Sequence, residues 1–485
     1  MEPIDLVTIT KKNEVYIKVD SPADIAQEIC DHFTFLVPGH TFIPAYRKRL
    51  WDGKIRLFNV YNRLLYHGLF EHLCKFLYVR DYKVKFGSDF EVTKCEISSK
   101  FIDSLSLPHI PRDYQLDAIN HALTHKRTLL ISPTASGKSL IIYILVRYLK
   151  LKTLILVPTT SLVSQMYNDF REYGWDVANN CHTVFAGRDK GSELPVVIST
   201  WQSIYKLNQK YFEQYELVIG DEAHGFKSKS LTSIMTKCIN AKYRIGTTGT
   251  LDGTQTHQLV LEGLFGKVYK VTSTKKLIDS KLLSPFIIKA ILLRHPDSIC
   301  HDLRKISYQE ELEYLITSEA RNIFIKNLVL SLKTNTLLLF RFVEKHGRIL
   351  YDMIKEETDA NNRKTFFVFG GTAADTREQI RAIVERETDS IIVASYGVFS
   401  VGINIRNLHN IIFASPSKSR IRNLQSIGRA LRKTKKKEMA TLYDIADDLS
   451  YGSHQNYTLD HYEERKKIYE EEKFKCAVYA VQLKT

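Results

Sequence analysis

Few features of the sequence point to disulfides, metal sites or membranes. The seven cysteines are an odd number, and no two of them form a Cys-x-x-Cys pair. This pattern argues against a disulfide framework and a cysteine-ligated zinc site, and it fits a reducing compartment. Every apolar stretch is interrupted by Lys, Arg or Pro before it could span a bilayer, and the N-terminus carries no basic, apolar leader. We therefore expect a cytoplasmic chain without a membrane segment.

Glycine and proline are scarce as well, with 22 and 12 residues in a chain of 485. Their scarcity argues against long disordered or low-complexity tracts, and no short internal repeat indicates a solenoid. Hydrophobic residues at 44% and charged residues at 25% are ordinary for globular proteins. The chain should therefore fold nearly end to end, into roughly two to four domains at this length.

Positive charge, in contrast, is in excess. Lys and Arg number 69 against 54 Asp and Glu, which gives a formal net charge of +15. A surplus of this size favours a polyanionic partner held through its phosphates. Solvated lysines on an ordinary surface would give the same composition, so charge alone leaves both interpretations open.

From about Arg127 onward, short β-branched runs alternate with longer stretches of helical spacing, as in parallel α/β units. The runs form two series and are apolar on both faces, which indicates central strands covered by helices on each side. The first series consists of Thr128–Ile131, Thr153–Val157, Val196–Ser199, Leu217–Gly220 and Tyr243–Thr247. The second consists of Thr336–Phe340, Thr365–Phe369, Ser390–Ala394, Asn410–Ala414 and Ala440–Tyr443.

The predicted fold class is therefore α/β, with two tandem lobes and a small N-terminal α+β domain. Residues 1–105, rich in Tyr, Phe, His and basic residues, form this accessory domain, and residues 106–275 form the first lobe. The second lobe covers residues 276–450, and a bridging segment of about Lys267–Ser318 contains Pro285 and Pro296, which break any long helix. Residues 451–485 are expected to be a helical extension with a charged helix over His461–Lys473.

The strongest single motif is Ser-Pro-Thr-Ala-Ser-Gly-Lys-Ser at 132–139, between an apolar strand and the helix-like run Leu140–Leu149. Such a turn aims backbone N–H groups and a helix N-terminus at phosphates. Lys138 then reaches the β and γ phosphates of ATP, and the Ser139 hydroxyl is placed to bind Mg²⁺. Ser132 replaces the usual first glycine, and a chance turn before a helix is the alternative reading of this motif alone. The other loop residues expected to bind ATP are Thr134, Ala135, Ser136 and Gly137.

A second motif follows the strand Leu217–Gly220, which runs directly into Asp-Glu-Ala-His at 221–224. Ligands of open α/β sheets bind at the carboxyl ends of parallel strands. Asp221 is therefore expected to hold Mg²⁺ together with Ser139, and Glu222 to orient the attacking water. A solvated acidic turn is the alternative, but the order of the two motifs in one lobe argues against it.

A third motif, Gln-Ser-Ile-Gly-Arg-Ala-Leu-Arg at 425–432, lies in the second lobe. Arg429 and Arg432 are three residues apart, so on a helix they would share one face and could both neutralise γ-phosphate charge. Gln425 accompanies them as a third expected catalytic residue. Surface decoration is the more common role of an arginine pair, but the phosphate loop upstream favours arginine fingers.

In this order, the motifs resemble those of superfamily 2 helicases and translocases over about Leu107–Leu449. The resemblance implies two RecA-like lobes that use ATP and Mg²⁺ to move along nucleic acid. It implies adenine reading by Arg112 and Gln115, and contacts of Gly402 and Asn404 with ATP and nucleic acid. It also implies that three residues couple hydrolysis to lobe movement, namely His224, Thr248 and Thr250. The residues that it implies for tracking a nucleic-acid strand are Thr159, Thr160, Gln165, Thr200 and Gln202. Two departures are Thr-Gly-Thr at 248–250, where many members have Ser-Ala-Thr, and Ser426, where many relatives carry Arg.

A narrower resemblance covers nearly the whole chain and points to the UvsW-type phage helicases. It rests on Phe42–Tyr46, Trp51–Phe58, Asn62–Leu65, Val157–Thr160 and Val393–Ser400. The resemblance implies a DNA motor that unwinds or branch-migrates forks and four-way junctions in recombination, repair or replication. If the gene is carried by a phage, the expected location is the host cytoplasm. Protein partners are not indicated.

Basic and aromatic residues are interleaved near the N-terminus, and Arg47, Lys48, Arg49 and Trp51 are expected to contact DNA through phosphates and base stacking. The alternative is that Trp51 and Phe58 are core residues and the cations are merely solvated. A second basic run is expected to be an exposed loop and consists of Lys433, Lys435, Lys436 and Lys437.

Three other classes share some of these features. An RNA helicase would have the same lobes, and the motor subunit of a restriction-type complex would need a nuclease, for which no convincing motif is present. A scaffold that only binds ATP would normally lose the base or the fingers, yet Glu222, Arg429 and Arg432 are all present. An enzyme acting on DNA is therefore the preferred prediction.

Overall fold

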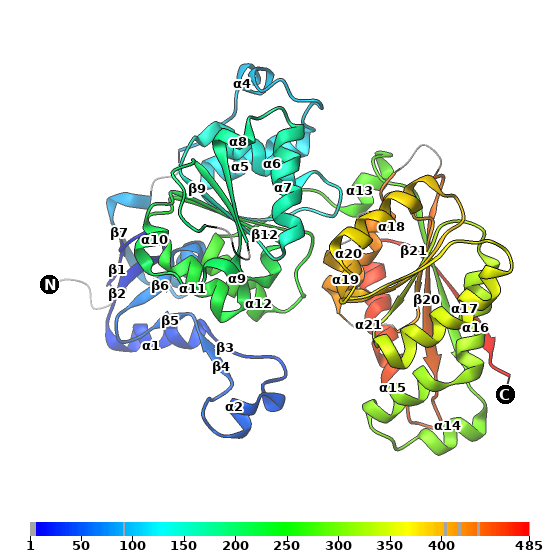
Figure 1. The fold of residues 1–485 in the computed structure, drawn as a ribbon. Coiled ribbons are helices and arrows are strands. Elements are labelled where there is room, and N and C mark those ends of the chain that lie inside the picture. The colour runs from blue at the N-terminus through cyan, green and yellow to red at the C-terminus, as the bar shows by residue number, and fades with distance from the viewer. Residues whose placement is uncertain are drawn as a thin grey trace. The chain divides into compact units, whose positions relative to one another are not determined.

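The chain divides into two structural units, which Figure 1 shows in colours that follow the sequence. Unit 1 comprises residues 1–132 and 137–271, and unit 2 comprises residues 133–136 and 272–485. The structure is a computed structural model that describes residues 6–90, 93–185, 187, 189–401, 405–415, 419–433 and 437–484. Within these ranges, none of the helices combines the length and the apolar character that a membrane span requires.

The N-terminal domain is a mixed five-stranded sheet in the order β5-β6-β2-β1-β7, with two helices. In β1 and β2, buried residues such as Val7, Ile9, Ile17 and Val19 alternate with more exposed ones, because successive side chains of a strand point to opposite faces. The strands are β1 (Leu6–Lys11), β2 (Tyr16–Asp20), β5 (Phe58–Asn59), β6 (Leu64–Tyr66) and β7 (Lys83–Phe86), and the helices are α1 (Ala23–His32) and α3 (Phe70–Val79).

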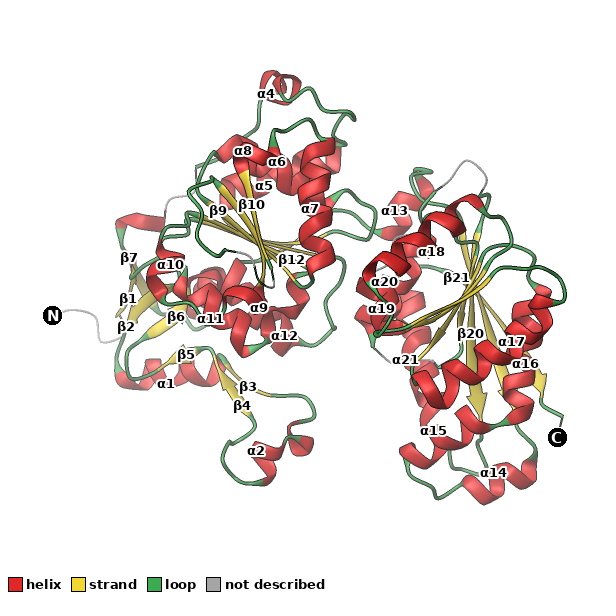
Figure 2. Cartoon of the chain, in the orientation of Figure 1, coloured by secondary structure: helices red, strands yellow, loops and turns green. Residues whose placement is uncertain are grey.

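A protruding segment interrupts this domain between α1 and β5. The antiparallel pair β3 (Thr34–Leu36) and β4 (Lys54–Arg56) forms its stem, and the short helix α2 (Pro44–Arg47) lies at its far end (Figure 2). Its large apolar side chains face solvent, since Phe42 is 76% and Leu50 78% exposed. Apolar side chains this exposed contribute nothing to the core of the domain.

The N-terminal domain has its own core but is seated on the first lobe. Its hydrophobic cluster includes Leu259 of helix α12 (Gln255–Phe265), which belongs to the lobe. His72 lies 2.7 Å from the carboxylate of Glu262, a side chain that is almost fully buried. At Gly68 the two backbones approach so closely that an added Cβ would lie 2.0 Å from the carbonyl oxygen of Glu262. The domain is therefore part of unit 1 and not an independent body.

The first lobe contains a fully parallel seven-stranded sheet in the order β10-β11-β9-β12-β13-β8-β14. The five predicted strands agree with the structure to within about one residue, and the edge strands β10 and β14 were not predicted. The strands are β8 (Arg127–Ile131), β9 (Thr153–Val157), β10 (Cys181–Val184), β11 (Val196–Thr200), β12 (Leu217–Asp221), β13 (Tyr243–Thr248) and β14 (Val268–Lys270).

Helices cover both faces of this sheet, as Figure 2 shows. Neighbouring strand residues enter different hydrophobic clusters: Leu130 and Ile155 join one cluster, and Leu129 and Leu154 join the other. The first cluster receives side chains from α5 (Asp113–His125), α6 (Lys138–Leu149), α7 (Thr160–Glu172) and α8 (Val177–Asn180). The second receives them from α9 (Trp201–Ile204), α10 (Gln209–Glu213), α11 (Lys229–Lys237) and α12. The small helix α4 (Ser99–Ser104) precedes α5.

The second lobe repeats the architecture with the order β17-β18-β16-β19-β20-β15-β21, again fully parallel. Its strands are β15 (Phe286–Arg294), β16 (Thr336–Phe340), β17 (Thr365–Val368), β18 (Ile391–Ser395), β19 (Asn410–Phe413), β20 (Ala440–Asp448) and β21 (Lys475–Gln482). Its helices are α13 (Thr274–Asp279), α14 (Asp297–Leu303), α15 (Tyr308–Thr317), α16 (Glu319–Ser331), α17 (Ile349–Asp359), α18 (Ala374–Arg386), α19 (Tyr396–Val401), α20 (Arg420–Ala430) and α21 (Tyr457–Glu471). The fold class predicted from the sequence is confirmed.

Two expectations about this lobe were wrong in part. The segment interpreted as a bridge contains β15, which lies inside the sheet between β20 and β21, and the two prolines that flank it limit the strand. The expected C-terminal helix exists as α21, but β21 follows it and forms the edge of the sheet. Both strands pair with partners far away in the sequence, and local spacing carries no signal for such pairing.

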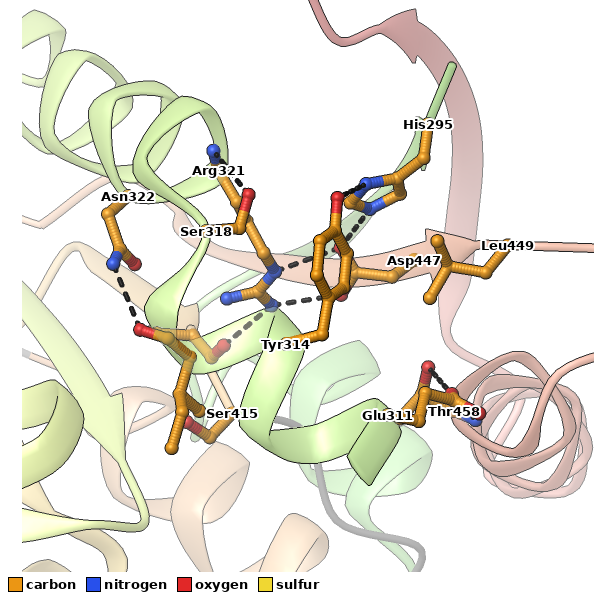
Figure 3. A network of polar contacts seen from close by, with 12 residues as sticks. His295, Glu311, Tyr314, Ser318, Arg321, Asn322, Ser415, Asp447, Leu449 and Thr458 are labelled. Carbon is orange, nitrogen blue, oxygen red and sulfur yellow. Dashed lines mark hydrogen bonds and ion pairs between the residues drawn. The ribbon is translucent and has the colours of Figure 1, made fainter. Parts of the chain in front are cut away.

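A buried polar network joins the carboxyl ends of the second lobe's strands to α15 and α16 (Figure 3). Arg321, which is 1% exposed, donates to both carboxylate oxygens of Asp447 at 2.8 and 2.9 Å. His295 contacts the same carboxylate at 3.1 Å. Buried charges are tolerated only when they are paired and hydrogen-bonded, so this network fixes β20 to the helices that cover it.

Candidate ATP site and nucleic-acid interface

The predicted phosphate-binding loop joins β8 to α6. Ala135 (φ 65°) and Gly137 (φ 83°) have left-handed backbone, which turns the chain sharply before α6 begins at Lys138. The Ser136 hydroxyl donates to the carbonyl of Pro133 at 2.6 Å and braces the turn. Lys138 donates back to the carbonyl of Ser132 at 3.2 Å. The lysine amine is therefore held at its own loop, where a phosphate would meet it together with the start of the helix.

Of the two residues predicted to read adenine, Gln115 contacts this loop and Arg112 contacts Gln115. Gln115 is buried, accepts from the backbone N–H of Arg112 at 2.8 Å and donates to the carbonyl of Gly137 at 3.4 Å. A Cβ on Gly137 would lie 2.3 Å from the Gln115 amide nitrogen, so a larger residue would displace that side chain and be strained by the left-handed backbone. Thr134 is half-buried in the same loop.

The acidic motif begins at the carboxyl end of β12, in register with β13. Asp221 is buried and accepts a hydrogen bond from the Thr247 hydroxyl at 2.6 Å. Burial raises the pKa of Asp221, and the charge of Glu222 adds to this effect, whereas the charge of Lys138 opposes it. A cation at this position would relieve the cost of the buried carboxylate. Glu222 follows with a left-handed backbone (φ 51°).

His224, Thr248 and Thr250, predicted to couple hydrolysis to movement, lie together. The Nδ1 atom of His224 is 3.1 Å from the Thr248 hydroxyl and 3.4 Å from a carboxylate oxygen of Glu222. The Thr248 hydroxyl donates to the carbonyl of Thr250 at 3.2 Å. The N–H of Ser132 donates to the carbonyl of Thr248 at 2.8 Å. The phosphate loop, the acidic motif and the Thr-Gly-Thr segment are therefore joined by direct hydrogen bonds.

Ser139, the other predicted Mg²⁺ ligand, has a partner that the sequence did not reveal. Its hydroxyl lies 2.9 Å from the phenol oxygen of Tyr173, which follows α7. Among the described residues, no group of three or more His, Cys, Asp or Glu could hold a metal by protein ligands alone. Ser139 and Asp221 supply only hard oxygen donors, which suit a Mg²⁺ ion that takes its other ligands from water and phosphates.

The expectation for the arginine pair was wrong in its geometry. Helix α20 ends at Ala430, so Arg432 does not share a helical face with Arg429. Arg432 instead forms an isolated β-bridge with Leu283, and the neighbouring Leu431 carbonyl accepts from Ser284 N–H at 2.8 Å. This pairing directs the chain after Ala430 away from the helix and toward the residues that precede β15.

The remaining predictions for this lobe have mixed outcomes. Gln425 lies on α20, and the adjacent Ser426 is fully buried. Lys437, expected in an exposed loop, is only 4% exposed and donates to the carbonyl of Arg432 at 3.2 Å, and burial lowers its pKa to about 7. The described residues do not include Gly402, Asn404, Lys435 and Lys436, and they omit the side chain of Arg429.

Comparisons with known proteins agree with this arrangement. Three family models match the chain: "DNA helicase UvsW, N-terminal" over residues 7–87, "Type III restriction enzyme, res subunit" over 109–253 and "Helicase conserved C-terminal domain" over 320–434. Over 498 residues, the chain is 34% identical to the ATP-dependent DNA helicase uvsW of Enterobacteria phage T4, covering 96% of this chain and 98% of that protein. The chain belongs to the UvsW family of ATP-dependent DNA helicases.

Two solved structures and a further relative are also similar to the chain. The crystal structure of T4 UvsW matches this helicase with a TM-score of 0.50 and 33% identity, over 99% of this chain and 100% of that one. The DNA 3'-5' translocase XPB2 of Sulfurisphaera tokodaii is 25% identical over 391 residues, covering 71% of this chain and 84% of that protein. The DNA-bound restriction-modification enzyme LlaBIII, at 16% identity and a TM-score of 0.56, shares the fold over 78% of this chain and 32% of its own.

The residues predicted to track a strand lie at or after the carboxyl ends of β9 and β11, two adjacent strands of the helicase's first lobe. Thr159 caps α7 by accepting from Leu162 N–H at 3.4 Å, and Thr200 precedes α9. Gln202 donates to the carbonyl of Pro158 at 3.3 Å, which joins the ends of β9 and β11. Thr160 and Gln165 are exposed on α7.

The basic and aromatic residues of the N-terminal domain belong to its protruding segment. Lys48 and Arg49 are exposed, and Arg47 donates to the carbonyl of Thr41 at 3.0 Å. Trp51 is half-buried outside the hydrophobic core and donates to the carbonyl of Lys54 at 2.9 Å. Phe58, in contrast, is a core residue of β5. The two aromatic residues left open by the sequence therefore differ, because only Phe58 joins the core.

Proposed function

We propose that this helicase uses ATP and Mg²⁺ to unwind or branch-migrate forked and four-way DNA in recombination, repair or replication, in the host cytoplasm if it is phage-encoded. The observation that carries the proposal is the N-terminal domain. It matches the UvsW N-terminal model over residues 7–87, and contacts such as His72 with Glu262 fix it to the first lobe. A domain attached in this way moves with the lobe and can hold one arm of a branch beside the motor.

The proposed ATP chemistry follows from the charges around the phosphate loop. Lys138 would neutralise β- and γ-phosphate charge, and Glu222 would orient the attacking water. Gln425, Arg429 and Arg432 of the second lobe are proposed to stabilise the charge that develops on the transferred phosphate. A glutamate with left-handed backbone directly after a buried strand supports the role of Glu222, because strained backbone is common where a side chain must be aimed.

Mg²⁺ fits the donors at this site. Bound with the nucleotide, it would neutralise phosphate charge. Asp221 is a buried carboxylate whose raised pKa reflects burial and the neighbouring Glu222, and a cation would stabilise its ionised form. The Ser139 hydroxyl can donate its hydrogen to Tyr173 and turn a lone pair toward the ion, since the two oxygens are 2.9 Å apart. Asp221 and Ser139 are therefore the proposed protein ligands.

DNA is proposed to follow the ends of β9 and β11, where Thr159, Thr160, Gln165, Thr200 and Gln202 present hydroxyl and amide groups. Such groups bind phosphates and sugars, which position a strand without reading its sequence. ATP-driven movement of one lobe, transmitted through the His224–Thr248 contact, would then advance the enzyme along the strand. The helicase should therefore select DNA shape and not base sequence.

The branch itself is proposed to meet the protruding segment. Arg47, Lys48 and Arg49 supply cations for phosphates, and Trp51 lines a hollow of about 620 Å³ with Tyr46 and Leu50. Exposed aromatic and apolar side chains beside cations suit an unpaired base and its phosphate. The two strands of the stem, β3 and β4, place this group away from the body of the domain.

A substrate panel tests the proposal. ATP hydrolysis and strand separation are measured on single strands, linear duplex DNA, forks, four-way junctions and RNA duplexes. We expect forks and junctions to be processed faster than linear duplex DNA, and RNA duplexes to remain intact. Equal rates on forks and linear duplexes would remove the branched-substrate proposal, and RNA unwinding at the DNA rate would favour the RNA-helicase alternative.

A charge variant addresses the protruding segment. Replacing Arg47, Lys48 and Arg49 by Ala removes three phosphate contacts, and we expect fork affinity to fall by about tenfold or more and to depend less on salt. ATP hydrolysis stimulated by single strands should change little. The matched control replaces Lys83 and Lys85, exposed cations on β7 of the same domain. An equal effect of both variants would show that only general charge matters.

A further inference from the structure

A histidine outside the helicase motifs contacts the backbone of the acidic motif. His257 lies in the first turn of α12 and is 4% exposed. Its Nε2 atom is 2.9 Å from the backbone carbonyl oxygen of His224, in the 3₁₀ turn η4 (Ala223–Lys227). A carbonyl oxygen only accepts, so Nε2 must carry the hydrogen and donate it to the turn.

Asp252 orients the ring of His257. One carboxylate oxygen of Asp252 lies 2.8 Å from Nδ1 of His257, and the same oxygen accepts from the N–H and hydroxyl of Thr254 at 2.9 and 2.8 Å. The backbone N–H of Asp252 is also near Nδ1, but at the longer distance of 3.3 Å. The arrangement of carboxylate, imidazole and carbonyl fixes the imidazole plane, because each nitrogen has a partner in a set direction.

His224 is consequently held at two points by one stretch of chain. Thr248 contacts its side chain at 3.1 Å, and His257 contacts its backbone carbonyl at 2.9 Å. The segment Thr248–His257, called the bracket below, therefore contacts the turn that begins with Glu222 at both of its own ends. Glu222 has left-handed backbone, a conformation that persists for a bulky residue only when its surroundings enforce it.

The same bracket faces the N-terminal domain. Asp252, Thr254 and His257 line a cavity of about 540 Å³, which Arg56 and Leu57 of the N-terminal domain also line. Arg56 belongs to β4, one strand of the protruding segment's stem. The stem of the protruding segment and the residues that hold His224 therefore line one cavity.

We propose that His257 is a positioning residue that sets the Glu222–His224 turn for hydrolysis and links it to the N-terminal domain. The inference rests on the proposed function, because it assumes that Glu222 orients the attacking water. His257 does not contact phosphate in this role. It acts through the carbonyl of His224, and Asp252 acts through His257.

Two substitutions separate the two ring nitrogens. In His257→Gln the amide nitrogen reaches about as far as Nε2 and can still donate to the His224 carbonyl, whereas in His257→Asn it reaches only as far as Nδ1. We expect the Asn variant to lose DNA-stimulated kcat by about tenfold or more, as a misplaced catalytic group does, with KM for ATP within about twofold. The Gln variant should retain most of kcat. Both variants should melt at similar temperatures.

The matched control is His67, a second largely buried histidine of unit 1 that lies in the seam between the N-terminal domain and the lobe. His67→Asn should lower the melting temperature and leave kcat unchanged. The inference fails if Asn and Gln at 257 behave alike, or if kcat simply follows the melting temperature in all three variants. A wild-type chain without DNA-stimulated hydrolysis would instead contradict the proposed function itself.

Discussion

At the scale of single residues, the site is a set of side chains that hold one another in place. Ser139 and Tyr173 come from elements that the sequence gives no reason to join, yet their oxygens lie 2.9 Å apart. Either hydroxyl can donate in this hydrogen bond, and when Ser139 donates its single hydrogen to the phenol oxygen, its lone pairs are free for a cation. Tyr173 is therefore expected to matter for Mg²⁺ and not for the nucleotide.

Tyr173→Phe removes that acceptor without changing the packing of the ring. Loss of one such hydrogen bond costs about 1 kcal/mol, so we expect the Mg²⁺ concentration for half-maximal ATP hydrolysis to rise about fivefold. The measurement is a Mg²⁺ titration at saturating ATP and DNA. Tyr148→Phe, on α6 with its phenol near Cys95, is the control and should leave the titration unchanged. An unchanged titration for Tyr173→Phe would show that Ser139 needs no orienting partner.

The placement of several candidate site residues could be predicted from the sequence because it depends on local patterns. Gly137, Lys138 and Ser139 lie within a turn of a few residues, Asp221 ends its strand and Glu222 follows it directly. Tyr173 and His257 could not be predicted, because their partners are far away in the chain. The hydrogen bond from the Thr247 hydroxyl to Asp221 could be predicted only in part. The sequence predicted both strands, but it did not predict the register that places these two residues side by side.

At the scale of elements, local patterns predicted the strands of each series but not their neighbours. β15 and β21 pair with each other, and β15 also pairs with β20. The apolar run of β15 was visible, but the flanking prolines favoured a linker. β21 follows a charged helix and leaves Val478 and Tyr479 about half exposed, so it lacks the strong burial signal of a central strand. The end of α20 was missed for the same reason, because the bridge from Arg432 to Leu283 is not local.

The contact between the N-terminal domain and the first lobe, here called the seat, depends on the close approach of the backbone at Gly68 to helix α12. A Cβ there would lie 2.0 Å from a backbone oxygen, so Gly68→Ala must push the domain away from α12. We expect a loss of about 1–3 kcal/mol in unfolding free energy, as in other overpacked sites. Fork unwinding should fall more than ATP hydrolysis on single strands. Thermal unfolding and both activity assays measure this.

The control is Gly87→Ala, in the same domain. Its added Cβ would meet no atom closer than 3.7 Å, which is ordinary contact. Equal effects of the two alanines would contradict a specific role of Gly68 in the seat.

At the scale of the whole molecule, each unit has its own cores and its own buried polar groups. In the second lobe, His346 lies between the Ser415 hydroxyl at 2.8 Å and the Asn322 amide oxygen at 3.2 Å. Burial lowers the pKa of His346 to about 3, and the charge of Arg321 adds to the effect. Burial would raise the pKa of Asp447, but Arg321 and His295 outweigh it and lower this pKa to about 2.

These shifts give a signed prediction for acid stability. His346 is neutral in the folded protein, whereas in the unfolded chain it takes up a proton below pH 6.5. Its contribution to the free energy of unfolding is therefore complete above pH 6.5 and is lost as the pH falls toward 3. The ionised Asp447 contributes about 2 kcal/mol above pH 3.8, which is lost as the pH falls through 2. The melting temperature should therefore fall as the pH is lowered from 6.5, and it should fall less steeply in His346→Gln. His301→Gln, at an exposed histidine on α14, should keep the wild-type slope. Parallel slopes for all three proteins would rule out His346 as a source.

Glu222→Gln gives the most direct measurement of the central claim, that ATP hydrolysis at the Glu222 turn drives DNA strand separation. DNA-stimulated ATP hydrolysis and fork unwinding are followed in the same samples, together with ATP binding. Since an oriented base contributes about a hundredfold or more, we predict that both activities fall together by at least that factor while ATP still binds. Fork unwinding at the wild-type rate by Glu222→Gln would contradict the account.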